Sequence, residues 1–477
     1  MTRPEHAAPT GHSGESEPGS AVASPTMALA TAVGVIATLV AGLFVLALPI
    51  HALMVIAIGW TALCLRSTGI PYDVLRKMMT EGIAEALPAI FVFFLIGMVI
   101  ASFMVSGTVA TLMVLGLDWL TPQSFLVIGF LLCVLMSLAT GTSWGTVGTA
   151  GIVLMGIGTA LDVSAPLVAG VVISGATFGD KMSPVSDTTN LAAMSAGTEL
   201  FAHIRAMLWT TVPTALIVIA VLIAFSGADF EGPMPAAAAE LRDALESHFA
   251  LNWIVGLVPI AVMLGLSWRR LAPEVCMIAS TASALLLAFV YQDRTASELV
   301  SVLWQNAPTD TGIAELDALL GRGGMASMSW TLMLALLALA LGGMLLRGGV
   351  IEALITPVIA RARRPATLVG ATIGTGFLGN AALGEAYVSI LLTAQSYRDA
   401  FARRGLPAPV LSRSVEEGAT LTTGLIPWTT AGAFYAATLG VPTLEYAPYA
   451  LLNYLNPIVA TVMAAFGIGL MGAKPSR

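Results

Sequence analysis

Long apolar runs are the feature that most constrains how this 477-residue chain can fold. Runs of 17 or more residues recur between residues 27 and 471, and each could cross the ~30 Å hydrocarbon core of a bilayer as a helix. Only 10% of the residues are charged, whereas 57% are hydrophobic. The sequence therefore predicts an all-α protein that crosses the lipid bilayer many times.

Some of these apolar segments are continuous, and others are interrupted by polar residues, glycine or proline. The interrupted segments 123–160 and 366–397 are predicted to form helical, re-entrant hairpins, and 164–200 and 407–440 to form broken helices. With the broken helices counted as spans, we expect about ten full spans plus the two hairpins. The continuous spans are expected at 27–48, 49–66, 86–107, 203–226, 251–268, 272–291, 328–347 and 447–471.

Charges in the connecting loops predict the orientation of the spans. Basic residues gather in some connections, such as Arg361, Arg363 and Arg364, and the positive-inside rule places these connections in the cytoplasm. The acidic connections 227–250 and 292–327 then lie outside, and both termini are cytoplasmic. The spans alternate sides only if each hairpin enters and leaves on one side. The first hairpin is predicted to open outward and the second towards the cytoplasm.

An internal repeat supports two halves of opposite orientation. APLVAGVVISGATFGDKMSPVSDTTNLAAMSAG from Ala165 aligns without gaps with APVLSRSVEEGATLTTGLIPWTTAGAFYAATLG from Ala408, and 9 of 33 positions match. Inverted-topology repeats with interrupted segments at matching positions are typical of secondary transporters, whose site lies where the breaks meet. We expect a disordered cytoplasmic tail at 1–26, an N-terminal half at 27–226, an extracytoplasmic linker at 227–250 and a C-terminal half at 251–477.

The polar stretch FGDKMSPVSDTTN at 178–190 interrupts the first of these repeat segments. A charged residue at mid-bilayer costs ~2.5 to 3.5 kcal/mol, so Asp180, Lys181 and Asp187 must pair, face water or hold an ion. Pro184 frees backbone carbonyl oxygens, and together with carboxylate, hydroxyl and amide oxygens these suit a hard cation such as Na⁺. A carboxylate there could hold Na⁺ or a proton. The candidate cation and proton ligands are Asp180, Ser183, Ser186, Asp187, Thr188, Thr189 and Asn190.

A structural interpretation of the same stretch stays open. Asp180 and Lys181 would then form an ion pair, while Asp187 and Thr188 would cap the helix that resumes near Asn190. Several of these residues could both bind an ion and stabilise the broken helix.

The hairpin tips and the second repeat add further candidates. Glu385 is an acid within an apolar segment, with no basic residue within ten positions, so it is either functional or placed in a pair or at an interface. Glu417 stands beside Arg413 and, like Lys181, is predicted to be charge-paired. The candidates at the hairpin tips and in the second repeat are Thr142, Ser143, Asn380, Glu385, Thr429 and Thr430.

Several function classes are disfavoured. The net charge of −7 and the scattered basic residues provide no stripe for nucleic acid. The three cysteines have no paired spacing that would indicate a disulfide framework or zinc site. GTSWG at 141–145 fits the pattern of a serine nucleophile, yet no histidine is expected at hairpin depth, so an intramembrane serine protease is a remote alternative. No cofactor is expected, and transport would draw on ion gradients.

The elements GTSWGT, SGATFGDKMSPVSDTTNLAA, GGMASMSW and GLIPWTTAGAFYAATLG resemble the NhaC family of sodium/proton antiporters, from about residue 30 onwards. The resemblance implies the wider ion transporter superfamily, with two inverted repeats, dimeric assembly and an elevator-like motion. It carries most directly onto the 180–190 stretch. The second hairpin departs from the family pattern, because LGEAYVS stands where a Thr-Gly-Asp-Gln-Tyr stretch is expected.

Two transport hypotheses follow. In the first, the chain is a Na⁺/H⁺ antiporter of a bacterial inner membrane, and Asp187 is the leading exchangeable carboxylate with Asp180 and Glu385 in support. In the second, the same fold exchanges a small organic acid or amino acid, coupled to Na⁺ or H⁺. Lys181 and nearby hydroxyls would then meet the carboxylate of the cargo.

Overall fold

A computed structural model describes residues 24–84, 87–229, 236–269, 271–306 and 309–471. Within these residues every regular element is helical, which confirms the all-α prediction. Seven helices are long and apolar enough to cross a membrane, or up to nine if two bent helix pairs each count as one span. Most of the expected tail at 1–26 lies outside the described residues, and α1 begins at Pro25 with Ser24 as its N-cap.

Two of the seven helices, Pro122–Thr140 and Pro365–Leu383, are arms of the predicted hairpins, so five, or seven with the bent pairs, correspond to the ten expected full spans. The difference lies mainly in the segments that were expected to be broken. The helices of 164–200 and 407–440 are either short or carry charged residues, so none of them qualifies as a span by length and apolarity. The expected span at 447–471 also contains only a shorter apolar helix, Leu451–Ala465, because the chain turns at Gly467 and Gly469, which both have positive φ.

Two series of helices correspond to each other along the chain. Helices α4 and α18 begin 242 residues apart, and α6 and α20 begin and end 243 residues apart; the pairs α5 and α19, and α10 and α24, also match at both ends. The first series is α4 (Leu87–Val105), α5 (Thr108–Trp119), α6 (Pro122–Thr140), α7 (Ser143–Thr146), the π-helical η2 (Val147–Gly151), α8 (Ile152–Ala160), α9 (Ala165–Met182) and α10 (Asp187–Ala196). The second series is α18 (Ser329–Arg347), α19 (Val350–Arg361), α20 (Pro365–Leu383), α21 (Ala386–Arg403), α22 (Ala408–Gly418), α23 (Thr420–Thr423) and α24 (Thr430–Leu439).

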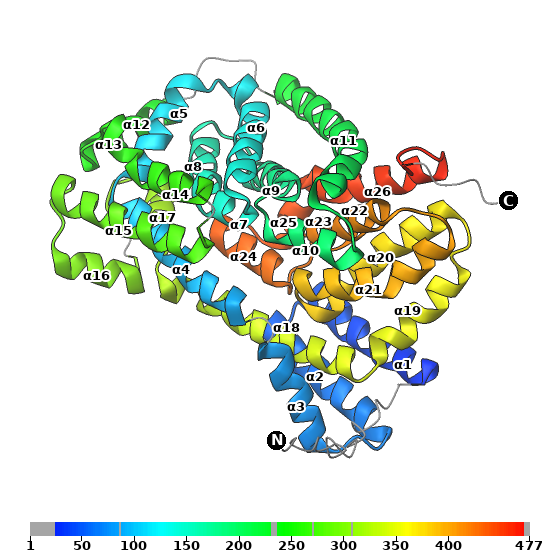
Figure 1. Cartoon of the computed structure of the whole chain (residues 1–477). Coiled ribbons are helices and arrows are strands. Elements are labelled where there is room, and N and C mark those ends of the chain that lie inside the picture. The colour runs from blue at the N-terminus through cyan, green and yellow to red at the C-terminus, as the bar shows by residue number, and fades with distance from the viewer. Residues whose placement is uncertain (1–23, 85–86, 230–235, 270, 307–308, 472–477) are drawn as a thin grey trace, which may run out of the picture.

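The remaining helices surround these two series (Figure 1). The helices before the first series are α1 (Pro25–Val40), η1 (Ala41–Val45), α2 (Ile50–Ser67) and α3 (Tyr72–Ala84), and the long α11 (Leu200–Asp229) follows that series. Between α11 and the second series lie α12 (Ala236–His248), α13 (Trp253–Gly256), α14 (Val258–Trp268), α15 (Pro273–Tyr291), α16 (Ala296–Trp304), α17 (Ala314–Leu320) and η3 (Met325–Met328). The chain ends with α25 (Thr443–Tyr446), η4 (Ala447–Tyr449) and α26 (Leu451–Ala465).

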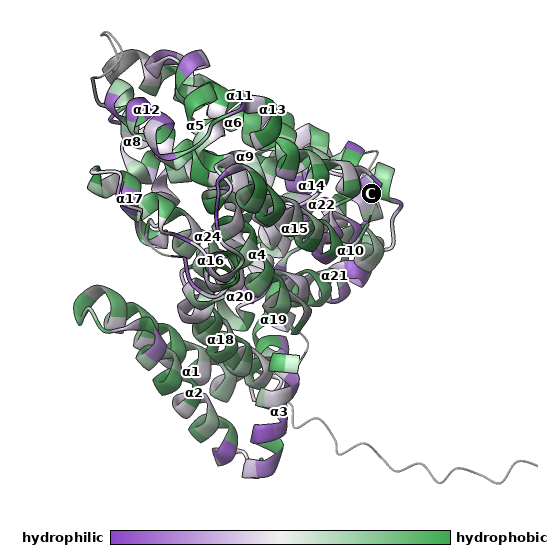
Figure 2. Ribbon diagram, turned by 90° about the vertical axis from the view of Figure 1, so that its left-hand side faces the viewer, coloured by the Kyte–Doolittle hydropathy of each residue, from purple (hydrophilic) through white to green (hydrophobic). Residues whose placement is uncertain are grey.

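The two series interlock at their broken segments. Helix α10 of the first series packs against α21 of the second, while α24 of the second packs against α7, η2 and α8 of the first. Within each series the hairpin also packs against the broken helix, as α6 does against α9 and α20 against α22. Figure 2 shows apolar residues on most of the helices and hydrophilic residues on α3 and α12, which lie at opposite ends of the molecule. The two series therefore meet at their broken segments.

Glycine at the hairpin tips is required by backbone conformation. Gly141 and Gly384 have φ of +70° and +71°, and a Cβ at position 384 would lie 2.7 Å from the Ala338 Cβ. We expect Gly384→Ala to lower stability by more than ~1 to 2 kcal/mol, because the left-handed backbone and the overlap both disfavour a side chain. The apparent melting temperature of the purified protein measures this loss.

Gly405 provides the matched control, because its φ is +67° but a Cβ there would meet nothing within 4 Å. Gly405→Ala should therefore lose only the backbone contribution, about 1 to 2 kcal/mol. Equal losses in the two variants would show that the contact with α18 does not constrain the hairpin tip.

Candidate cation site

The four interrupted segments break at corresponding places. The two hairpins break at residues 141–142 and 384–385, and the two broken helices at 183–186 and 424–429. Local capping explains where the chain resumes: Ser186 caps α10 by accepting from Thr189 N, and Thr429 caps α24 by accepting from Gly432 N. The new helices α7, α10 and α24 lie near the centre of the molecule (Figure 1). Polar groups freed by the breaks therefore face one another.

Asp180 lies where the two breaks of the first series meet. Its Oδ2 accepts hydrogen bonds from Ser143 N at 3.1 Å and Ser143 Oγ at 2.7 Å, and its Oδ1 accepts one from Ser186 Oγ at 2.7 Å. The second series also reaches this group, because the hydroxyl of Tyr435 on α24 donates to Ser143 Oγ at 3.0 Å. Asp180 is only 6% exposed. Hydrogen bonds of this kind stabilise a buried carboxylate but leave its charge without a counter-ion.

Asp187 belongs to the same region but is exposed. Its Oδ2 accepts a hydrogen bond from the hydroxyl of Tyr387, on the first turn of α21, so it links the two series across the break. Its Oδ1 accepts from Thr188 N at 2.8 Å. Asp187 thus lines the site in a more open position than Asp180.

Glu385 provides the corresponding carboxylate of the second series. It is 3% exposed and its Oε2 accepts a hydrogen bond from Thr430 Oγ1 at 2.6 Å. At the offset of 243 residues, Glu385 corresponds to Thr142 and Thr430 corresponds to Asp187. Each series therefore has one acid and one threonine at these two positions, in exchanged order. The sequence showed that Thr430 replaces an acid, and the structure shows that the hairpin supplies an acid beside it instead.

Several predicted ligands mainly join the broken backbone. Ser183 Oγ donates to Leu138 O at 2.8 Å, Thr189 Oγ1 to Lys181 O at 3.1 Å, and Asn190 Nδ2 to Ser186 O at 2.6 Å. In the second series, Asn380 Nδ2 donates to Ala419 O at 2.6 Å and Thr429 Oγ1 to Thr423 O at 2.5 Å. These bonds bring side-chain donors to carbonyls at or beside the breaks.

A cavity of about 830 Å³ connects the breaks. It is lined by residues of both hairpin tips and both broken helices, together with α14 and α15. Among the described residues that line it are four acids and no lysine, arginine or histidine. The acids are Asp180, Asp187, Glu274 and Glu385, and the hydroxyl-bearing residues are Thr140, Thr142, Ser143, Thr188, Ser267, Tyr387, Thr420, Thr423, Thr430 and Tyr435. Such a lining favours a cation over an anion.

A second group of charges is buried beside this cavity without lining it. Lys181 interacts electrostatically with Glu416 and Glu417 of α22, and its Nζ has no hydrogen-bond partner in the part of the chain that the structure describes. Arg413 Nε lies 3.8 Å from Glu417 Oε1, and Thr210 of α11 also donates to Glu417. Lys181 and Glu417 are thus near opposite charges, as their predicted pairing role requires. No ion pair within the described residues joins Lys181 to Asp180, because successive residues on a helix face different directions.

The buried charges do not balance. Among the described residues, the buried acids are Asp180, Glu385, Glu416 and Glu417, and the buried bases that carry a charge are Lys181 and Arg413. With His203 neutral, the ionised interior would hold a net charge of −2. Unpaired buried charge is costly, so such an interior requires protons or bound cations.

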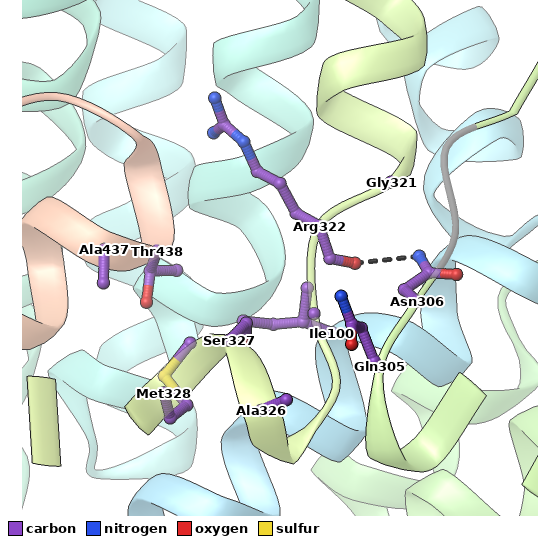
Figure 3. Close-up of a pocket in the computed structure, with 11 residues that line it drawn as sticks. Ile100, Gln305, Asn306, Gly321, Arg322, Ala326, Ser327, Met328, Ala437 and Thr438 are labelled. Carbon is purple, nitrogen blue, oxygen red and sulfur yellow. Dashed lines mark hydrogen bonds between the residues drawn. The ribbon is translucent and has the colours of Figure 1, made fainter. Parts of the chain in front are cut away.

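A smaller cavity of about 210 Å³ shares no lining residue with the first. Figure 3 shows it between Arg322, Ser327 and Thr438, with Asn306 Nδ2 donating to Arg322 O at 2.8 Å. Its lining contains one arginine and no acid. It does not provide a cation site.

Sequence reasoning missed Tyr387, Tyr435 and Glu416 as parts of the site. Tyr387 directly follows Glu385 and Ala386 at a hairpin tip, so its position was a usable signal. Glu416 was visible beside Glu417 as a candidate for pairing with Arg413, but its contact with Thr188, like that of Tyr435 with Ser143, depends on packing between segments more than 200 residues apart.

The fold and site define a multi-pass membrane protein in which interrupted helices enclose buried acids, as in secondary transporters. The model of the Na⁺/H⁺ antiporter family matches residues 19–189 and 175–468. The chain is 35% identical to the Na⁺/H⁺ antiporter NhaC of Alkalihalophilus pseudofirmus, over 91% of this chain and 94% of the relative. It is 33% identical to the malate-2H⁺/Na⁺-lactate antiporter of Bacillus subtilis (81% and 83%) and to the arginine/ornithine antiporter ArcD of Halobacterium salinarum (92% and 91%).

The chain therefore belongs to the Na⁺/H⁺ antiporter (NhaC) family. It is a secondary antiporter and not an enzyme, which confirms the family resemblance and argues against the protease alternative.

Proposed function

We propose that this chain exchanges external H⁺ for internal Na⁺ by alternating access. The observation that carries the proposal is the buried net charge of −2 beside a cavity that four acids line. Two monovalent cations or protons would neutralise that charge, and because the same carboxylates can take either, Na⁺ and H⁺ compete for them. Competition for one site is what couples their movements in opposite directions.

Asp180, Asp187 and Glu385 would hold the exchanged cations, with the hydroxyls of Ser143, Ser186, Thr188 and Thr430 completing an oxygen shell. Asp180 accepts three hydrogen bonds from protein donors, whereas Glu385 is the most enclosed of the three acids at 3% exposure. Asp187, the leading candidate from sequence, lies in the open part of the cavity and would meet the cation first.

The finer predictions of topology belong to this proposal. The matching bounds of the two helix series support two inverted repeats, in which 123–160 and 366–397 are re-entrant hairpins that open to opposite sides. Both termini would be cytoplasmic, the protein would lie in a bacterial inner membrane, and a homodimer with an elevator-like motion remains a prediction of the family resemblance.

Transport assays in vesicles test this function. When purified full-length protein is reconstituted with an internal pH dye, an outward Na⁺ gradient should acidify the lumen. The apparent Na⁺ affinity should fall as the pH is lowered, by up to about tenfold per pH unit for one competing proton, because protons then occupy the carboxylates. A Na⁺ affinity that does not change with pH, or Na⁺ movement without proton movement, would contradict the proposal.

A second candidate is exchange of a small organic cation on the same site. A cavity of about 830 Å³ far exceeds the volume of a sodium ion, and its lining carries acids without a base. The relative named for arginine/ornithine exchange shows that the family includes an antiporter for cationic amino acids. Organic anions are less well matched, because Lys181 does not line the cavity.

Ligand-dependent thermal stabilisation separates the two candidates. Na⁺, arginine, ornithine, malate and lactate would each be added at constant ionic strength to the purified protein. Stabilisation by Na⁺ alone supports the first candidate, and stabilisation by the amino acids in the absence of Na⁺ supports the second.

A further inference from the structure

A chain of hydroxyls leads from the cavity to the buried charges of α22. Ser186 Oγ donates to Asp180 Oδ1 at 2.7 Å, Ser186 Oγ lies 3.1 Å from Thr188 Oγ1, and Thr188 Oγ1 donates to Glu416 Oε1 at 3.5 Å. Exposure is 7% or less at each of the four residues. The hydroxyl chain thus joins Asp180, which lines the cavity, to Glu416, which does not.

The hydroxyl chain has one hydrogen too few for all of its hydrogen bonds. It has three oxygen-to-oxygen links, but Ser186 and Thr188 each supply only one hydrogen, and each donates it outward to a carboxylate. The central link between the two hydroxyls then has no hydrogen. One additional proton, bound to either carboxylate, would complete all three links.

We propose that Ser186 and Thr188 carry a proton between Asp180 and Glu416, so that Glu416 is a second proton site. In the transfer, the proton on Asp180 Oδ1 passes to Ser186 Oγ, the proton of Ser186 passes to Thr188 Oγ1, and the proton of Thr188 passes to Glu416 Oε1. Each hydroxyl loses one proton and gains one, so only the two carboxyl groups change. The link of 3.5 Å is at the limit of hydrogen bonding and must shorten for transfer.

The surroundings of Glu416 suit such a site. Its Oε2 is buried and has no hydrogen-bond partner among the described residues, so this oxygen can take a proton without breaking a hydrogen bond. Charges of both signs act on Glu416, with Lys181 on one side and Asp180 and Asp187 on the other. The charged or titratable groups described on the elements packed around it are Asp180 and Lys181 of α9, Asp187 of α10, His203 and Arg205 of α11, Glu385, Tyr387, Tyr397, Arg398, Asp399 and Arg403 at α21, Arg413 and Glu417 of α22, and Tyr454 of α26.

This inference rests on the proposed function in one respect. If Na⁺ binds at Asp180, the proton it displaces can move to Glu416 and need not leave through the cavity that the Na⁺ has entered. The protein could then hold Na⁺ and a proton at the same time on neighbouring carboxylates. That state is not available when one carboxylate alone exchanges the two ions.

Infrared difference spectroscopy of the full-length protein tests the inference without transport. Raising the pH in Na⁺-free buffer should remove a protonated-carboxyl band that Glu416→Gln lacks. Glu417→Gln is the matched control, because Glu417 is equally buried, carries the same change and lies outside the hydroxyl chain. Its spectrum should keep the band. A Glu416→Gln spectrum identical to that of the unmodified protein would overturn the inference, whether or not the protein exchanges Na⁺.

Thr188 variants test the path itself. Thr188→Val keeps the shape but removes the hydroxyl, so the Glu416 band should remain while Na⁺-driven proton flux at saturating Na⁺ falls by about tenfold or more. Thr188→Ser should restore most of the flux. Full flux in Thr188→Val would show that protons reach Glu416 by another route and would overturn the role of the hydroxyl chain. If the Glu416 band is present but no variant moves protons with Na⁺, the proposed function fails and the second proton site stands.

Discussion

Replacing Asp180 with asparagine is expected to abolish Na⁺-driven proton movement and to weaken Na⁺ binding at least about a hundredfold, equivalent to ~3 kcal/mol. Asparagine has nearly the same size but no charge. Its NH₂ group would also face Ser143 or Ser186, which both donate to the aspartate. Na⁺ flux and proton flux in vesicles, together with Na⁺-induced thermal stabilisation, measure the effect.

Asp118→Asn provides the control. Asp118 is a partly exposed acid paired with Arg242, away from the cavity lining. Its loss should change transport by less than about twofold, because exposed ion pairs contribute little. If Asp180→Asn retains normal exchange while remaining folded, Asp180 is not the central carboxylate and the site must be rebuilt around Asp187 and Glu385.

The second large effect is expected on stability. Lys181→Met should destabilise the protein by about 3 to 5 kcal/mol, because it leaves Arg413 as the one buried cation beside Glu416 and Glu417 among the described residues and changes the buried net charge from −2 to −3. The loss should lessen as the pH falls, since protonating a glutamate removes the uncompensated charge. Thermal unfolding of the purified protein across a pH series measures both.

Lys77→Met is the matched control, because the Lys77 side chain is 74% exposed and lies 3.7 Å from Glu81. Its loss should cost at most about 1 kcal/mol at any pH. The double variant Lys181→Met, Glu417→Gln should recover part of the stability by restoring the net charge to −2. Equal stability of the Lys181→Met variant and the unmodified protein would show that the cluster is solvated and needs no cation.

Much of the fold could be predicted because its signals are local. Apolar run length indicates helices that suit a bilayer, and glycine, proline and capping residues mark where they break. The structure has a break at the expected position of Pro184, and the predicted hairpins turn beside the candidates Thr142 and Glu385. The number of spans was less predictable, because it depends on where each helix ends. A short polar helix and a span can have similar residue types and differ in length and in the helices that they contact.

The candidate site could also be predicted only in part. Asp180, Asp187 and Glu385 could be selected from sequence, because an acid within an apolar segment stands out. Their ranking could not, since exposure depends on which segments cover them. Lys181 illustrates the limit. Its neighbour Asp180 was the natural partner by sequence, yet the helix turns Lys181 towards Glu416 and Glu417.

The sequence by itself determined that this chain is helical, suited to a membrane and interrupted at matching points by polar residues. Only the tertiary structure decided which polar groups meet: Tyr387 with Asp187, Tyr435 with Ser143, and Thr188 with Glu416. The physical reason is that helix formation and breakage depend on residues within one or two turns. The meeting of side chains 200 or more positions apart depends on how the two series pack, which no local pattern encodes.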